Sequence, residues 1–148
     1  MKIHLNRLAA SALIALIICL TASITGFEGK CQDLRDNVLR LHIIANSDSE
    51  TDQALKLKVR DALIDSKVVD FDSCTNLLEA KEKAKAELKT ITEIAQNEIS
   101  KNGFNYNVEV LVDKSYFETR VYDNFTLPAG EYDSVIVKIG AAKGKNWW

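Results

Sequence analysis

The sequence has few of the residues that build metal sites, disulfide frameworks and phosphate-binding loops. It contains 3 cysteines, 2 histidines, 6 glycines and 1 proline in 148 residues. Beyond the N-terminal segment the only histidine is His42, and the cysteines have no C-x-x-C spacing, so we predict no metal site. The segment from Gly140 to Gly144 has neither the spacing of a P-loop nor a helix after it. These absences predict a protein that binds no cofactor.

Positive and negative charges are present in nearly equal numbers. The chain has 19 lysine and arginine residues against 21 aspartate and glutamate residues, a formal net charge of −2. Proteins that bind nucleic acid need a basic patch or stripe, and no stretch of this sequence has one. We therefore expect no nucleic-acid partner.

The N-terminus has the layout of a secretory signal. Lys2, His4 and Arg7 precede an apolar run from Leu8 to about Phe27, with small residues near its end for cleavage. The alternative is an uncleaved membrane anchor, because the run reaches the lower limit for crossing a bilayer. We accordingly divide the chain into residues 1–27, a signal peptide or N-terminal membrane anchor, and residues 28–148, a single domain on the far side of the membrane.

Two cysteines, Cys31 and Cys74, lie in the part expected to be exported. Disulfides form readily outside the cell. A single pair without a characteristic spacing is weak evidence, so the sequence does not decide whether these two cysteines form a disulfide.

The first half of the domain predicts one strand and two helices. Apolar residues alternate with Arg40 and His42 between residues 38 and 45, as in a half-buried strand. A polar lead-in over residues 28–37 precedes it. Ser49 opens a capping-box pattern, so a helix should begin there. A longer helix should cover residues 75–101 and end at Asn102-Gly103.

From residue 105 onward the hydrophobic period changes to two. Alternating segments centred on residues 106–112, 117–121 and 135–139 predict three strands, and the short polar turns between them predict an antiparallel meander. The expected fold is therefore a two-layer α+β domain, with the helices on one face of the sheet.

One catalytic reading can be assembled around His42. It would pair this histidine with Ser47 or Ser49 and with Asp48 or Asp52, as in a hydrolase. The sequence lacks a nucleophile elbow, and Ser and Asp are common at helix caps for structural reasons. A hydrolase is therefore the alternative, and the leading prediction is a protein that is not an enzyme.

The chain ends in two adjacent tryptophans, Trp147 and Trp148. They could close over the edge of the sheet as part of the core. They could also form an exposed aromatic anchor for a partner or a membrane surface.

Three separated motifs resemble the stage II sporulation protein R family. The first is Leu39-Arg-Leu-His-Ile-Ile-Ala-Asn-Ser-Asp-Ser, followed by Asp52-Gln-Ala-Leu-Lys-Leu-Lys-Val-Arg-Asp. The second is Leu127-Pro-Ala-Gly-Glu-Tyr, and the third is Asn146-Trp-Trp. The resemblance covers about residue 38 to the end. Members of the family generally continue past the tryptophan pair into a short tail with Cys and Pro, whereas this sequence stops at Trp148.

The resemblance implies a secreted signal of endospore formation. Such a protein is made in the forespore and exported into the space between the forespore and mother-cell membranes. There it triggers a membrane-embedded aspartic protease, stage II sporulation protein GA, to process the pro-form of sigma factor E. We expect this protease to contact residues drawn from the motifs: Arg40, His42, Asn46, Ser47, Asp48, Asp52, Glu131, Tyr132, Trp147 and Trp148.

Overall fold

The computed structural model describes residues 2–71, 73–123 and 125–145, with side chains from residue 10 onward. It divides into two compact units, residues 1–34 and residues 35–148. The predicted boundary after residue 27 concerns export rather than compactness and stays a prediction. Trp147 and Trp148 lie outside the described residues.

The first unit is a single long helix, α1 (Lys2–Arg35). Residues 10–35 are long and apolar enough to cross a membrane, with a mean hydropathy of 2.1, which fits either a signal peptide or an anchor. The polar lead-in expected over residues 28–37 is instead helical as far as Arg35. The segment contains no proline, and a helix already formed extends at little cost through polar residues.

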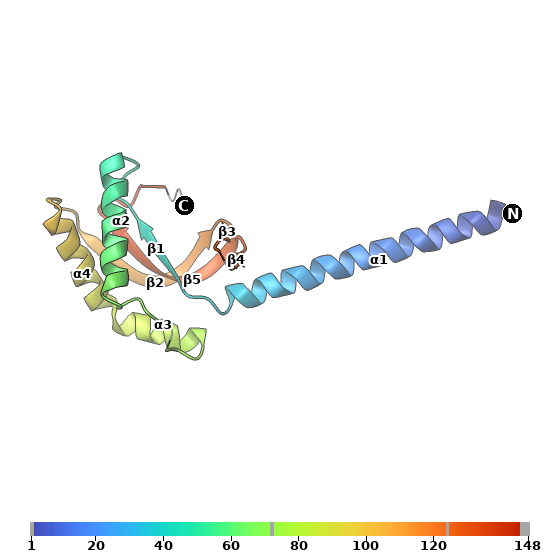
Figure 1. Ribbon diagram of the computed structural model, residues 1–148, viewed down its shortest axis with the longest axis horizontal. Coiled ribbons are helices and arrows are strands. Elements are labelled where there is room, and N and C mark those ends of the chain that lie inside the picture. Colours follow the sequence, from blue (N-terminus) through green and yellow to red (C-terminus); the bar gives the residue numbers. More distant parts are fainter. Residues whose placement is uncertain (1, 72, 124, 146–148) are drawn as a thin grey trace. The chain divides into compact units, whose positions relative to one another are not determined.

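The second unit contains a mixed sheet of three strands (Figure 1). They are β1 (Arg40–Ile44), β2 (Val108–Phe117) and β5 (Gly130–Ile139), in the order β1-β5-β2. β5 is central, parallel to β1 and antiparallel to β2. His42 pairs with Ile136, which pairs in turn with Leu111.

The α+β class is confirmed, but the predicted three-stranded antiparallel meander is wrong. The middle segment forms only the short strands β3 (Arg120–Val121) and β4 (Thr126–Leu127), which pair with each other in a separate sheet. The Tyr122 N–H donates to the Phe125 carbonyl at 2.8 Å, beside the two residue pairs that join β3 to β4. β5 pairs with β1 instead, so the apolar side chains of the two strands lie on the same face of the sheet and belong to one core.

Helix α2 (Glu50–Asp65) begins where the capping pattern predicts, and Ser49 is its N-cap. The predicted helix over residues 75–101 is two helices, α3 (Leu77–Ala86) and α4 (Leu88–Lys101), which meet at Glu87. No glycine or proline marks this break, and residues on both sides of it pack into one core. Gly103, with φ of 82°, follows the end of α4 as expected.

Helices α2, α3 and α4 lie on one side of the sheet (Figure 1). The buried residues between the three helices and the sheet form the main core, and all are aliphatic. These residues are Ile43, Leu55, Val59, Leu63, Ala84, Ile91, Ala95, Ile99, Val135, Val137 and Ile139. The alternation predicted for β1 is confirmed, since Ile43 belongs to this core and Arg40 and His42 project from the opposite face.

Candidate functional site

The turn from β1 into α2 is held by hydrogen bonds between short polar side chains. Ser49 Oγ accepts from the backbone N–H of Asp52 at 3.2 Å and so satisfies a free donor of the first helical turn. Ser47 Oγ accepts from the Ser49 N–H at 3.2 Å, and Gln53 Nε2 donates to the Ser47 carbonyl at 3.0 Å. This part of the junction is a helix cap.

Asp52 lies at the centre of the junction and is buried, with 4% of its surface exposed. Its Oδ2 accepts from Ser47 Oγ at 2.5 Å and from Asn46 Nδ2 at 2.9 Å. Burial is the largest influence on the pKa of Asp52 and raises it, but hydrogen bonds from Ser47, Asn46 and Tyr106 outweigh burial and lower the pKa overall. The carboxylate is therefore charged at neutral pH and satisfied from within the fold.

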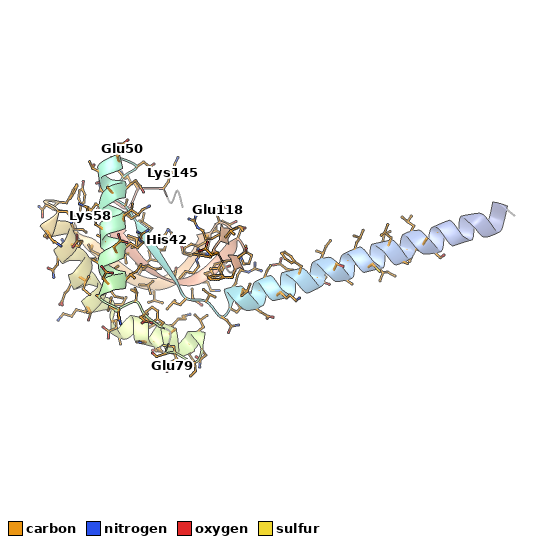
Figure 2. The ribbon with its side chains drawn as sticks, in the orientation of Figure 1. His42, Glu50, Lys58, Glu79, Glu118 and Lys145 are labelled. Carbon is orange, nitrogen blue, oxygen red and sulfur yellow. The ribbon has the colours of Figure 1, made fainter. Side chains whose placement is uncertain are left out.

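The segment after β5 docks against the same junction. Asn46 Oδ1 accepts from the Ala141 N–H at 2.9 Å, and the Ala45 carbonyl accepts from the Gly144 N–H at 2.9 Å. The backbone N–H of Lys145 donates to Asp48 Oδ1 at 2.6 Å. In Figure 2, Lys145 and Glu50 accordingly lie at the same end of the domain, where α2 begins.

A second cluster lies on the sheet face opposite the helices. The Arg40 guanidinium carbon is 3.9 Å from the centre of the Phe117 ring and 4.9 Å from that of Tyr132, so the cation is held by two aromatic faces. Tyr132 is buried and donates through its hydroxyl to the Pro128 carbonyl at 2.6 Å. Arg40 Nη1 is buried and has no hydrogen-bond partner within the described ranges.

His42, labelled on β1 in Figure 2, belongs to this second cluster. Its Nδ1 is 2.6 Å from Ser115 Oγ, and its ring centre is 5.1 Å from that of Phe117. Burial lowers the pKa of His42, and the positive charges of Lys56 and then Arg40 lower it further. The imidazole is therefore neutral at neutral pH.

In the structure, the serine beside His42 is neither of the two that the sequence predicted. Ser47 and Ser49 bond within the junction, and the serine beside His42 is Ser115 on β2. The sequence pattern predicted a polar turn between residues 112 and 117, so it placed Ser115 in a turn. The structure corrects this, because Ser115 lies within β2, and the order of the strands brings it to His42. Within the part of the chain that the structure describes, no group of three His, Cys, Asp or Glu side chains could hold a metal, and the three cysteines are free.

The expected contact residues thus fall into two clusters. Asn46, Ser47 and Asp52 are joined directly, and Asp48 holds the C-terminal segment beside them. Arg40, His42 and Tyr132 gather around Phe117. The buried Lys56 of α2 interacts with both clusters. Its charge lowers the pKa of His42, while burial lowers the pKa of Lys56 itself and the charge of Asp48 partly opposes that shift. Glu131 is exposed.

The part of the chain that contains both clusters matches a known protein family. Residues 35–148 match the family model described as Stage II sporulation protein R. The chain is 38% identical over 113 residues to the Stage II sporulation protein R of Bacillus subtilis (strain 168), an alignment that covers 76% of this chain and 50% of that protein. The chain thus spans about half the length of this curated relative. No solved structure matches the chain.

Proposed function

Because the chain belongs to the stage II sporulation protein R family, we propose that it is an exported signalling protein of endospore formation. It activates a membrane-embedded aspartic protease, stage II sporulation protein GA, which processes the pro-form of sigma factor E. The observation that carries the proposal is a family match spanning residues 35–148, joined to an apolar helix long enough for export. It acts as a ligand for the protease and not as an enzyme.

Export defines where the protein acts. The protein is made in the forespore, and its domain acts in the space between the forespore and mother-cell membranes. Helix α1 serves either as a cleaved signal or as an anchor that keeps the domain at the membrane surface. Mass spectrometry of the exported product separates the two: cleavage gives a domain that begins after about residue 25, and an anchor leaves Met1 in the membrane fraction.

Burial separates the predicted contact residues that can touch a partner from those that can only support their neighbours. Asp48 and Glu131 are exposed, and Arg40 and His42 are half-buried, so these four side chains can touch a partner. Asp52 and Tyr132 are 4% and 1% exposed and can act only by holding their neighbours in place. Asn46 and Ser47 are half-buried, and their side chains form hydrogen bonds within the fold.

A deletion strain tests the proposal. Without the gene, the pro-form of sigma factor E should remain unprocessed, and expression of the intact chain in the forespore should restore processing. A version lacking residues 1–27 is the matched control, because it carries the same domain but cannot be exported, and it should not restore processing. Processing on schedule in the deletion strain would contradict the proposal.

One observation favours a second candidate, an extracytoplasmic hydrolase. Ser115 Oγ lies 2.6 Å from a neutral imidazole that can accept its proton. Against it, no carboxylate among the described residues bonds to the other ring nitrogen of His42. Purified protein should be tested on ester and peptide substrates. Turnover that disappears in both Ser115→Ala and His42→Ala would favour the hydrolase, and its absence would favour the signalling protein.

A further inference from the structure

A groove of about 700 Å³ runs along the outer edge of β1. β1 is the end strand of its sheet, with β5 on one side. The groove is lined by Leu41 and Ile43, which face the core, and also by Arg40, which faces the other way. A groove that meets both faces of a strand opens at the strand's edge. Apart from the sheet itself, no backbone hydrogen bond among the described residues involves residues 39–44.

The walls of the groove are exposed apolar side chains. Ile64 of α2, 53% exposed, forms one wall. Tyr122 and Phe125, 43% and 57% exposed, form the other and stack with ring centres 4.7 Å apart at the tip of the β3–β4 hairpin. Apolar surface gathered beside an open strand edge is typical of a site that receives another chain.

The groove is also positively charged. Arg40, Arg60 and Arg120 line it, and none of its described lining residues is acidic. Arg60 pairs with Asp61 at 2.6 Å, whereas Arg120 makes no ion pair with any residue that the structure describes. The groove therefore complements a negatively charged occupant.

We propose that this groove binds an extended acidic segment of a partner protein, which adds to the sheet as a strand beside β1. Backbone groups of the segment would bond to the open edge, apolar side chains would pack on Ile64 and Phe125, and carboxylates would pair with Arg120. A second copy of this chain fits less well, because symmetric pairing of two β1 edges would bring the same arginines together. The inference deepens the proposed function, and only the identity of the partner rests on it.

Peptide binding to the intact chain in detergent micelles tests the proposal. The probe is a labelled nine-residue peptide of alternating valine and glutamate, measured by fluorescence anisotropy. Two comparison peptides replace glutamate with lysine or alternate valines with proline, which cannot complete a strand's hydrogen bonds. The glutamate peptide should bind at least tenfold more tightly than either, and hydrogen exchange should show new protection within residues 39–43.

Variants assign the binding to the groove. Arg120→Glu should reduce the preference for the glutamate peptide over the lysine peptide at least tenfold, whereas Lys89→Glu, at an 89% exposed position on α4, should not. Phe125→Ser should weaken binding at least tenfold, whereas Leu78→Ser, at a 70% exposed position on α3, should leave it unchanged. Each control matches the change in chemistry at a site away from the groove.

Three results would overturn the proposal: equal binding of the acidic and basic peptides, no effect of Arg120→Glu, or self-association that Phe125→Ser abolishes. The peptide assay and the deletion strain test separate claims, so a negative result in one does not decide the other. Normal processing of sigma factor E in the deletion strain would overturn the signalling function and leave the peptide result standing. Loss of peptide discrimination would overturn the groove and leave the deletion result standing.

Discussion

Asn46 Oδ1 accepts a hydrogen bond from the backbone N–H of Ala141 at 2.9 Å, which joins the end of β1 to the segment that follows β5. The Nδ2 of the same amide donates to Asp52 Oδ2 at 2.9 Å. One side chain therefore connects the first strand, the first turn of α2 and the C-terminal segment. The sequence motif that contains Asn46 holds three parts of the fold together and is also a candidate contact surface.

Asn46→Ala should lower the free energy of unfolding by about 1–3 kcal/mol, because the buried Asp52 carboxylate loses a donor and the Ala141 N–H loses its acceptor. Asn107→Ala is the matched control. Asn107 is exposed, and its bond to the Gly140 N–H uses the backbone carbonyl, which alanine retains. Chemical denaturation measures both, and equal midpoints for the two variants would contradict the structural role of the amide.

Gly140→Ala should destabilise the domain more than Gly103→Ala. Both glycines have positive φ, 58° and 82°, so alanine is strained at either position. At Gly103 an added Cβ meets open space, whereas at Gly140 it would collide with the Asn46 side chain. We expect the collision to add about 1–3 kcal/mol to the loss of stability.

A double variant tests the cause of this difference. Asn46→Ala removes the side chain that the new Cβ would meet, so Gly140→Ala should cost less stability in that background than in the wild type. Additive losses would show that the strain at residue 140 comes from its backbone alone.

The features that local patterns encode were predictable from the sequence. The alternation around Arg40 and His42, the cap at Ser49 and the helix end at Gly103 each depend on a few neighbouring residues. The break at Glu87 was not predictable, because no helix-breaking residue marks it and packing determines it.

The pairing of distant segments could not be predicted either. Strands β1 and β5 are parallel neighbours far apart in the sequence, and the hydrophobic alternation of β5 is the same for either partner. The sequence placed His42 on a strand and Ser115 in a turn, and it gave no sign that the two side chains meet. The groove beside β1 is likewise a product of strand order, since it requires β1 to lie at an edge.

His42 should make stability fall as the pH drops below about 6.5. Burial and the charges of Lys56 and Arg40 lower its pKa in the folded state, so between that pKa and 6.5 the unfolded chain binds more protons. Stability contributed by the neutral imidazole is thus complete above 6.5 and is lost as the pH falls through the folded pKa. The lowered pKa of Asp52 acts separately, below its ordinary value of 3.8.

His42→Gln should flatten this dependence. Unfolding free energies measured between pH 7.5 and pH 4.5 should fall less steeply in the variant than in the wild type. His4→Gln is the control, since His4 is the other histidine of the chain, and it should keep the wild-type slope. A wild-type slope in His42→Gln would mean that another group titrates in this range.

Lys56→Met should raise the pKa of His42 toward its ordinary value. Lys56 is 1% exposed on α2, and its charge is the largest influence after burial that lowers the pKa of His42. Methionine has a similar length and no charge, so it fills the same space while removing the repulsion. The control is Lys58→Met, because Lys58 is exposed and donates to Asn102 Oδ1 at 2.6 Å.

The imidazole chemical shifts of His42, followed by NMR against pH, measure this effect directly. Burial also lowers the pKa of Lys56 itself below 10.5, and Asp48 opposes the shift without reversing it. The wild type should therefore gain stability as the pH rises from the folded pKa of Lys56 toward 10.5, and Lys56→Met should lack this gain. An unchanged His42 titration in Lys56→Met, with the alkaline gain also retained, would show that the charge of Lys56 does not act on His42 and does not link the two clusters.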